Sequence, residues 1–217
     1  MKITVEAICA GKAQPFRGEE KSAFAKQPVS GSARIETDGL TCDTQADRVH
    51  HGGPHMAVHL YPRAHRTFWR ERIGAHPLLE EPGAFGTNLS VDGIDENDVL
   101  LGDQFRLGGA ILEVSQPRMP CWKIEHRFGQ KGMVAAILET GRCGWYFRVV
   151  ETGEVCAGDI LERIQTDRTP FTISQICREI AYPKAETNAD RIAEMAENEL
   201  LSPSWREGAK KRLSAFS

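Results

Sequence analysis

A two-glycine turn between two strand-like runs is the feature that most limits how this chain can fold. Residues 99–107 and 110–114 are rich in apolar residues, and Gly108 and Gly109 join them. Such a turn is typical of a tight β-hairpin, because glycine tolerates the positive φ angles that it requires. Pro117 and Pro120 then prevent the second strand from continuing. The centre of the chain is therefore predicted to be antiparallel.

Further strands are expected on both sides of this hairpin, at residues 2–9, 22–30, 33–37, 57–61, 144–150 and 157–164, with a turn at Gly153. Two helices are expected between them, at residues 62–73 and 133–139, where Gly74 and Gly141 suit the C-terminal ends. Short strands with few helices favour an antiparallel barrel or sandwich. The predicted fold class is mainly β with α.

The composition changes after Asp167, and the rest of the chain has helical patterns. Thr172 and Gln175 form a capping-box signature for a helix to about residue 181, and two more helices are expected at about 189–201 and 202–214. The sequence therefore predicts two domains, a β-rich barrel or sandwich over residues 1–165 and a three-helix bundle over residues 166–217, and the resemblance described below implies the barrel.

Charge and cysteine usage exclude several classes of function. The 217 residues carry a formal net charge of -3, so no overall field favours nucleic acid or an anionic membrane. No apolar run approaches the roughly 20 residues that span a bilayer. The six cysteines form no CxxC pair, which favours reduced thiols and a cytoplasmic location. These cysteines are Cys9, Cys42, Cys121, Cys143, Cys156 and Cys177.

The stretch SQPRMPCWK, residues 115–123, is the strongest candidate for chemistry. Its two prolines place Cys121 on a stiff loop at a strand end, between Arg118 and Lys123. Cationic neighbours lower the pKa of a thiol, and the thiolate is the form that attacks substrates or binds metals. The alternative is a buried, inert cysteine, and the local features favour neither reading.

Two glycine-containing stretches could surround an anion. In HHGGP, the N–H groups of Gly52 and Gly53 could form a nest, with His51 as a further donor. FGTNLS offers the side chain of Asn88 in the same way. The alternative for both stretches is an ordinary polar turn. A zinc site is disfavoured, because glycines interrupt the histidine cluster and a PCxxC pattern would need a cysteine at Ile124.

Two arginines could serve either structure or ligand binding. Arg148 lies inside the apolar strand WYFRVV, and a buried guanidinium needs a carboxylate or an anionic ligand. Arg118 has the same two interpretations. Asp43, Gln45 and Asp47 could bind the edge of a purine-like or pterin-like ring, although capping of turns is the default interpretation.

Together, these motifs resemble the MOSC domain family, and more narrowly its YiiM-like members. The resemblance rests on SQPRMPCWK, GLTCDTQADRVHHGGPHMAVHLYP, FGTNLS, LGDQFRLG and GWYFRVV, and it extends in order to the helical tail. It implies a β-rich barrel followed by three helices. It also implies molybdenum cofactor (molybdopterin), with Cys121 as metal ligand and catalytic residue. His51, Gly52, Gly53, Asn88, Arg118 and Arg148 would surround the pterin or its phosphate.

The resemblance further implies an oxidoreductase that reduces N-hydroxylated compounds, such as hydroxylaminopurines, to amines and so detoxifies N-hydroxylated bases. Electrons would come from a separate flavin or iron–sulfur protein, which agrees with the lack of a GxGxxG motif after a strand. Pyridoxal phosphate binding is a family-level association, and a homodimer is compatible with the resemblance. The expected partners include no nucleic acid and no membrane.

Three positions depart from the family pattern. Cys42 replaces a common glycine, His55 replaces the acid of HGGPD, and Thr87 replaces the glutamate of FGENL. The two missing acids leave an alternative open, in which the chain only carries the cofactor or a persulfide on Cys121. A third interpretation, an inert interaction domain, requires that Cys121 be buried.

Overall fold

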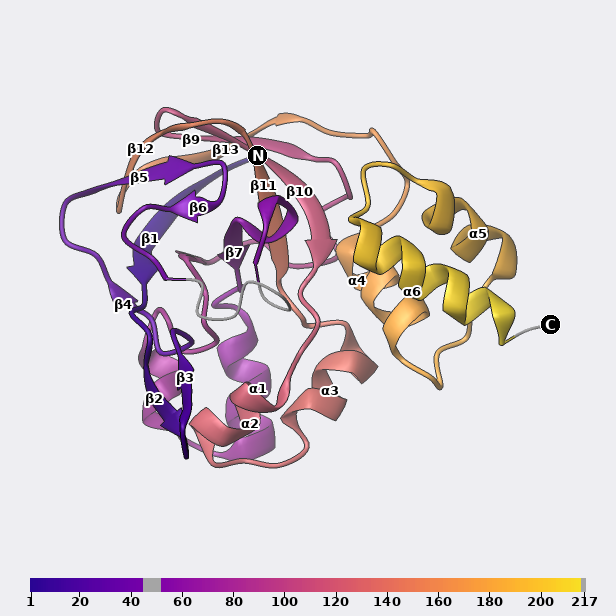
Figure 1. The fold of residues 1–217 in the computed structure, drawn as a ribbon, viewed down its shortest axis with the longest axis horizontal. Coiled ribbons are helices and arrows are strands. Elements are labelled where there is room, and N and C mark those ends of the chain that lie inside the picture. The colour runs from indigo at the N-terminus through magenta and orange to yellow at the C-terminus, as the bar shows by residue number, and fades with distance from the viewer. Residues whose placement is uncertain (45–51, 216–217) are drawn as a thin grey trace.

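The computed structural model describes residues 1–44 and 52–215, and a closed β-barrel forms its centre (Figure 1). In the main sheet the strand order is β13-β9-β10-β11-β7-β8-β1-β4, and an extra pairing of β1 with β13 closes all strands except β4 into a ring. The ring strands are β1 (Lys2–Ala10), β7 (Val58–Leu60), β8 (Leu89–Val91), β9 (Gln104–Leu107), β10 (Ala110–Pro117), β11 (Trp145–Glu151) and β13 (Ile160–Gln165). Closure leaves this ring without free edges. The expected mixture of a β-barrel with helices is confirmed.

The predicted hairpin forms two neighbouring strands of the barrel wall. Ala110 pairs directly with Leu107, so Gly108 and Gly109 form a two-residue turn between β9 and β10. Gly108 has φ 52°, and a Cβ there would come within 2.5 Å of the Glu154 carbonyl oxygen. Every pairing in the ring is antiparallel except the one between β7 and β8, which the sequence did not indicate.

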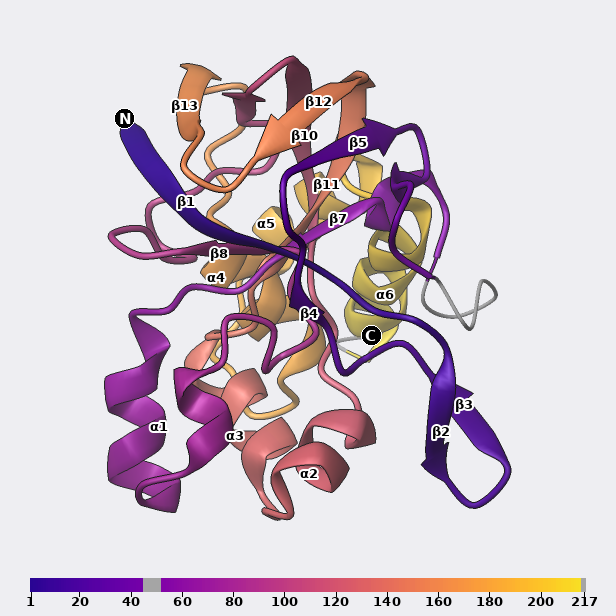
Figure 2. The ribbon, with the colours of Figure 1, turned by 90° about the vertical axis from the view of Figure 1, so that its left-hand side faces the viewer.

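Two small sheets lie beside the barrel. One contains β12 (Gly153–Cys156), β5 (Ser32–Glu36) and β6 (Gly39–Leu40), and the other is the hairpin of β2 (Gln14–Arg17) and β3 (Glu20–Ser22). Figure 2 shows this hairpin extending away from the barrel. Two predictions were wrong here. Gly153 begins strand β12 and pairs with Ile35, and residues 22–30 form only the end of β3 and the short β4 (Gln27–Pro28).

Helices cover one end of the barrel (Figures 1 and 2). They are α1 (His65–Ile73), α2 (Trp122–Phe128) and α3 (Met133–Thr140), and the short 3₁₀ turn η2 (Pro77–Glu80) lies beside α1. A second 3₁₀ turn, η1 (Pro54–Met56), lies against strands β10 and β11 instead. Gly74 and Gly141 end α1 and α3 with positive φ angles, as predicted. Helix α2 was not expected, because two prolines precede it.

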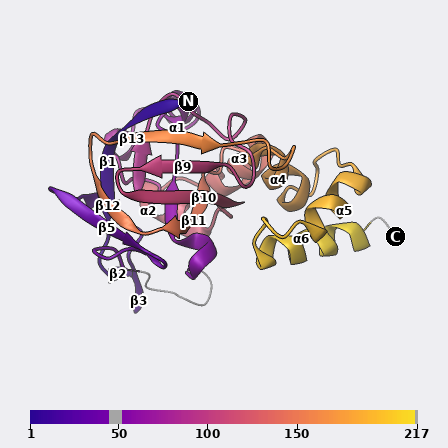
Figure 3. The ribbon, with the colours of Figure 1, turned by 90° about the horizontal axis from the view of Figure 1, so that it is seen from above.

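The C-terminal helices stand to one side of the barrel (Figure 3). They are α4 (Ile173–Ile176), the π-helical turn η3 (Cys177–Ala181), α5 (Ala189–Glu197) and α6 (Pro203–Ser214). Thr172 and Gln175 form both reciprocal bonds of the predicted capping box. Because Phe171, Ile176 and Trp205 belong to the same apolar cluster as the barrel interior, the tail and barrel share one core. Independent folding of residues 1–165 stays a prediction.

A buried carboxylate also holds the tail. The side chain of Glu113 on β10 is 7% exposed and contacts two arginines, Arg148 at 3.3 Å and Arg168. Gln104 donates a further hydrogen bond to it at 2.8 Å. Arg148 also donates a hydrogen bond to the carbonyl of Leu200, just before α6. The barrel wall is thus tied to the tail through polar contacts as well as through the core.

Candidate functional site

A pocket opens beside the first turn of α2, among segments that are far apart in sequence. Its volume is about 680 Å³, including the open mouth. The chain after β3 forms one wall, strands β7 and β11 form the floor, and the loop between β10 and α2 closes the other side. The polar and aromatic side chains around it include those of Phe24, Lys26, Asp43, His59, Asn88, Arg118, Cys121, Lys123 and Tyr146.

Cys121 lies at the pocket with its thiol half-buried and free. Strand β10 ends at Pro117, and Cys121 is the extended residue directly before α2, with φ −132° and ψ 166°. The predicted loop at a strand end is therefore correct. Cys9, Cys143 and Cys177, in contrast, are fully buried. The inert interaction domain required a buried Cys121, and this structure does not meet that requirement.

Arg118 is a buried cation without a carboxylate partner among the described residues. It is 4% exposed, and its Nη1 atom has no hydrogen-bond partner in the described part of the chain. Its guanidinium lies over the ring of Phe24, 5.5 Å from the centroid, and lines the same pocket as the phenol of Tyr146. A buried charge is costly unless something compensates it, so this position favours an anionic ligand.

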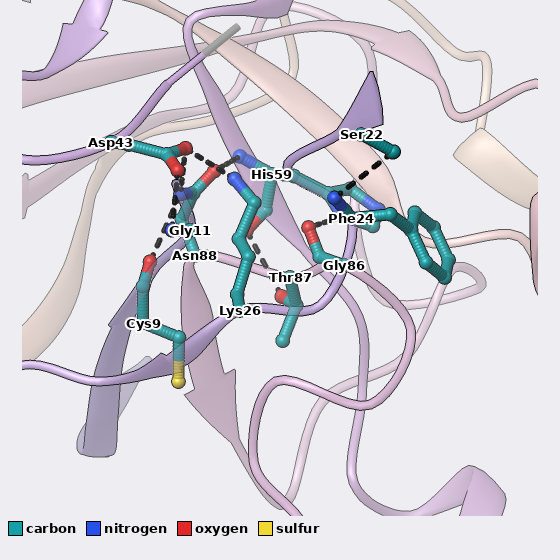
Figure 4. A network of polar contacts seen from close by, with 10 residues as sticks. All are labelled: Cys9, Gly11, Ser22, Phe24, Lys26, Asp43, His59, Gly86, Thr87 and Asn88. Atoms are coloured by element: carbon teal, nitrogen blue, oxygen red, sulfur yellow. Dashed lines mark hydrogen bonds and ion pairs between the residues drawn. The ribbon is translucent and has the colours of Figure 1, made fainter. Parts of the chain in front are cut away.

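The other pocket cations are compensated. Asp43 accepts hydrogen bonds from Lys26, from the backbone N–H of Gly11 at 2.8 Å and from Asn88 at 2.8 Å (Figure 4). Burial lowers the pKa of Lys26, and the adjacent Asp43 opposes that shift. Lys123 forms an ion pair with Glu20 at 3.2 Å. Asp43 therefore lines the pocket, although its carboxylate is occupied by Lys26, Asn88 and a backbone N–H.

The FGTNLS segment organises the pocket floor. Asn88 accepts from the backbone N–H of His59 at 3.0 Å and donates to Asp43 and to the Cys9 carbonyl. Both of its amide hydrogens are thus used within the protein. The Thr87 hydroxyl accepts from the N–H of Tyr61 at 2.9 Å and lies 3.0 Å from the His59 carbonyl. Asn88 lines the pocket, whereas Thr87 holds β7 against β8 from behind.

His59 forms the floor beside Tyr146. Its Nδ1 lies 3.1 Å from the Gly86 carbonyl, which can only accept, so Nδ1 carries the proton. Burial, and then the charge of Arg118, lower the pKa of His59 well below its usual value, so the imidazole is neutral. Tyr146 is its direct cross-strand partner, with ring centroids 4.8 Å apart. This contact fixes the orientation of the tyrosine ring.

The structure describes only part of the proposed glycine nest. His51, Gln45 and Asp47 lie outside the described residues. Gly53 has φ 93° directly before η1, but a Cβ there would meet nothing within 4 Å in the described structure. Gly52 and Gly53 do not line the pocket, although Met56 and Ala57, a few residues further on, do. The nest interpretation stays a prediction.

Arg148 does not line the pocket. It contacts Glu113 and Leu200, as described above, so the structure favours the structural ion pair that the sequence left open. Burial, and then the charges of Arg148 and Arg206, lower the pKa of His55, which also lies outside the pocket lining. Among the described residues, no group of three His, Cys, Asp or Glu side chains could hold a metal.

Sequence reasoning missed Lys26, His59 and Tyr146 as pocket residues. Lys26 lies in a polar segment, and nothing nearby indicates that Asp43 will bury it. His59 and Tyr146 lie in strands that were predicted, so alternation could indicate the face of each side chain. The pairing of these two strands, which brings the residues together, had no local signal in the sequence. No helix of the described chain is long and apolar enough to cross a membrane.

Comparisons with known proteins agree with this geometry. The MOSC domain profile matches residues 47–162. Protein YiiM of Escherichia coli is 36% identical over 210 residues, covering 95% of this chain and 92% of that protein. A protein of Gibberella moniliformis named "Reductase" is 35% identical over 172 residues, which are 79% of this chain but 30% of that protein.

A solved structure is similar over the full fold. The crystal structure of YiiM from Geobacillus stearothermophilus superimposes with a TM-score of 0.80 at 31% identity, covering 97% of this chain and 99% of that one. The YiiM similarity includes the C-terminal helices as well as the barrel. The chain belongs to the MOSC domain family, with YiiM homologues that match it over nearly its full length.

Proposed function

We propose that this protein is an oxidoreductase that uses molybdenum cofactor to reduce N-hydroxylated compounds, such as hydroxylaminopurines, to amines. One observation carries the proposal: the pocket places a half-buried thiol, Cys121, beside a buried guanidinium, Arg118, without a carboxylate partner among the described residues. A soft thiolate suits molybdenum, and an uncompensated guanidinium suits a phosphate. The residues present therefore fit the group.

Each pocket residue has a proposed part in holding that group. Cys121 would ligate the metal, and Arg118 would face the phosphate or another anionic part. Phe24 and Tyr146 would contact the flat ring system with their aromatic faces. When bound, the cofactor supplies two-electron chemistry that the side chains of this chain cannot provide.

The proposed reaction consumes two electrons and two protons. R–NH–OH gains both, the N–O bond breaks, and R–NH₂ and water leave. A reduced flavin or iron–sulfur protein would supply the electrons. The fungal relative carries the name "Reductase", which supports a reductive reaction in the family but does not identify the substrate.

The alternative function, a carrier that holds the cofactor without turnover, is based on the two acids that His55 and Thr87 replace. Neither residue lines the pocket: Thr87 bonds to backbone groups of the neighbouring strands, and His55 lies near Arg148 and Arg206. The two departures therefore do not remove an acid from the described pocket wall. Turnover separates the alternatives, since a carrier holds cofactor without reducing substrate.

The test uses protein made in a host that synthesises the cofactor. We expect stoichiometric molybdenum and turnover of N6-hydroxyladenine to adenine with an artificial reductant. Cys121→Ser should lose the metal and the activity while keeping the fold. Serine variants of the other five cysteines are controls and should keep the metal. Equal molybdenum in Cys121→Ser and wild type would reject the assignment, and metal without turnover would favour the carrier.

A further inference from the structure

The phenol of Tyr146 is one of the polar groups that line the pocket together with Cys121. Tyr146 lies on β11, is half-buried and lines the pocket. The Arg118 guanidinium lines the same pocket. A guanidinium has only donors, so Arg118 cannot accept the phenolic proton.

That proton has no acceptor among the residues that the structure describes. Across residues 1–44 and 52–215, no carbonyl or side chain accepts from the Tyr146 hydroxyl, although its backbone carbonyl does accept from Ser115 at 3.0 Å. The ring cannot turn freely, because His59 packs on it and is itself fixed by the Gly86 carbonyl. Tyr146 thus presents a fixed, unused donor to the pocket.

The same phenol is close to the proposed centre of chemistry. Burial raises the pKa of Tyr146, Arg118 opposes this shift, and the charge of Cys121 adds to it. The Cys121 thiol and the Tyr146 phenol line the same pocket. A ligand atom between them would receive a hydrogen bond from Tyr146.

We propose that Tyr146 recognises the oxygen of the N-hydroxy group by donating a hydrogen bond to it, and so distinguishes N-hydroxylated substrates from their amine products. Arg118 acts as a positioning residue, because a cation without acceptors in the same pocket favours orientations in which the phenolic proton points away from it. This inference rests on the proposed function for the identity of the substrate. It assigns to Tyr146 a specificity that neither the cofactor nor Cys121 provides.

The proposed hydrogen bond would affect the reaction as well as substrate binding. The substrate oxygen leaves as water, and a donor placed on that oxygen stabilises the negative charge that develops as the N–O bond breaks. The amine product lacks the oxygen, so its contact with Tyr146 is lost and the product leaves more easily. Tyr146 would therefore affect substrate binding, the bond-breaking step and product release.

The chain supplies a matched set of variants. Tyr146→Phe removes the hydroxyl but keeps the ring that stacks on His59, so the fold should be preserved. Tyr182→Phe removes a hydroxyl in the C-terminal tail, away from the pocket lining, and serves as the control. The ratio of dissociation constants for adenine and N6-hydroxyladenine is measured by calorimetry on each metal-containing protein without reductant, alongside molybdenum content.

We expect wild type and Tyr182→Phe to prefer N6-hydroxyladenine by about tenfold, the scale of one hydrogen bond. Tyr146→Phe should bring this ratio to about one at unchanged molybdenum content, and its kcat should fall. An unchanged ratio in Tyr146→Phe, or no preference in wild type, would overturn the inference. Preserved discrimination in a wild type that does not turn over would instead reject the proposed function alone.

Discussion

Replacing Arg148 with alanine should destabilise the cofactor-free protein. Arg148 lies 3.3 Å from Glu113 and donates a hydrogen bond to the Leu200 carbonyl, and its side chain is 20% exposed. Glu113 keeps Arg168 and Gln104 after the change, so it is not left as an isolated charge. The main losses are a charged hydrogen bond to the tail and part of one ion pair.

The magnitude follows from these contacts. Hydrogen bonds to charged groups contribute about 1.5–3 kcal/mol, and a partly exposed ion pair adds less than about 1 kcal/mol. We therefore expect a loss of about 2–3 kcal/mol in the free energy of unfolding. For a protein of this size, 1 kcal/mol shifts Tm by about 2–4 °C, so Tm should fall by about 4–12 °C.

The assay is thermal unfolding of cofactor-free protein by circular dichroism or calorimetry. Arg106→Ala is the matched control, because Arg106 is an exposed arginine on the neighbouring strand β9, and its change should stay within about 0.5 kcal/mol. An unchanged Tm in Arg148→Ala, together with weaker retention of the cofactor, would refute the reasoning and restore Arg148 as a cofactor ligand. Arg148→Lys keeps the charge and should lose less stability than alanine.

Three further predictions concern other parts of the molecule. Asp43→Asn should lower the free energy of unfolding by about 2–4 kcal/mol in chemical denaturation, because it leaves buried Lys26 without its carboxylate. Adding Lys26→Met should recover part of that loss in the double variant. A loss below about 0.5 kcal/mol would contradict the importance of this ion pair. Burial raises the pKa of Cys9 to about 11 from 9.0, so the unfolded chain loses this proton first and stability should fall between these pH values. Cys9→Ser should lessen that alkaline loss by about 2 kcal/mol at pH 11, and parallel pH profiles would show that Cys9 does not titrate in this way. Limited proteolysis should cut within residues 165–168, which are exposed, and leave the fragments associated through the shared core, whereas an uncut chain would show that this connection is protected.

The parts of the fold that the sequence predicted are local. The turn at Gly108 and Gly109, the end of α3 at Gly141 and the capping box at Thr172 each depend on residues within a few positions of each other. Barrel closure is different, because Lys2 on β1 must meet Glu162 on β13. No local pattern specifies that pairing, so a barrel and a sandwich stayed equally open.

Helix α2 shows a second limit. Its seven residues follow two prolines and include Trp122 and Phe128, which have low intrinsic helix propensity. Packing supplies the missing stability. The Arg17 guanidinium lies 3.7 Å from the Trp122 ring centroid, and His126 hydrogen bonds to the Phe16 carbonyl at 2.9 Å. These contacts come from a hairpin about a hundred residues earlier, which local reasoning could not connect to α2.

The candidate site shows the same division between local and distant information. The prolines and cations around Cys121 predicted an accessible thiol on a loop, and local sequence was sufficient for that. Local sequence was not sufficient to separate the roles of Arg118 and Arg148, since both arginines are next to or within apolar strands. Their roles differ because of what lies opposite each of them in space. Glu113 meets Arg148 across the β10–β11 ladder, whereas Arg118 has an aromatic ring and a phenol as neighbours.

This contrast indicates how structural cations can be distinguished from ligand-binding cations in related pockets. Lys26, Lys123 and Arg148 each have a carboxylate within ion-pair distance, so removal of any one should appear first as a loss of stability. Arg118 is buried to a similar degree without such a partner among the described residues, so its burial is uncompensated until an anion binds. Arg118→Met should then stabilise the cofactor-free protein or leave it unchanged, while it weakens retention of the anionic ligand. The opposite result, a large loss of stability without ligand, would mean that Arg118 is structural and that the pocket needs another explanation for its charge.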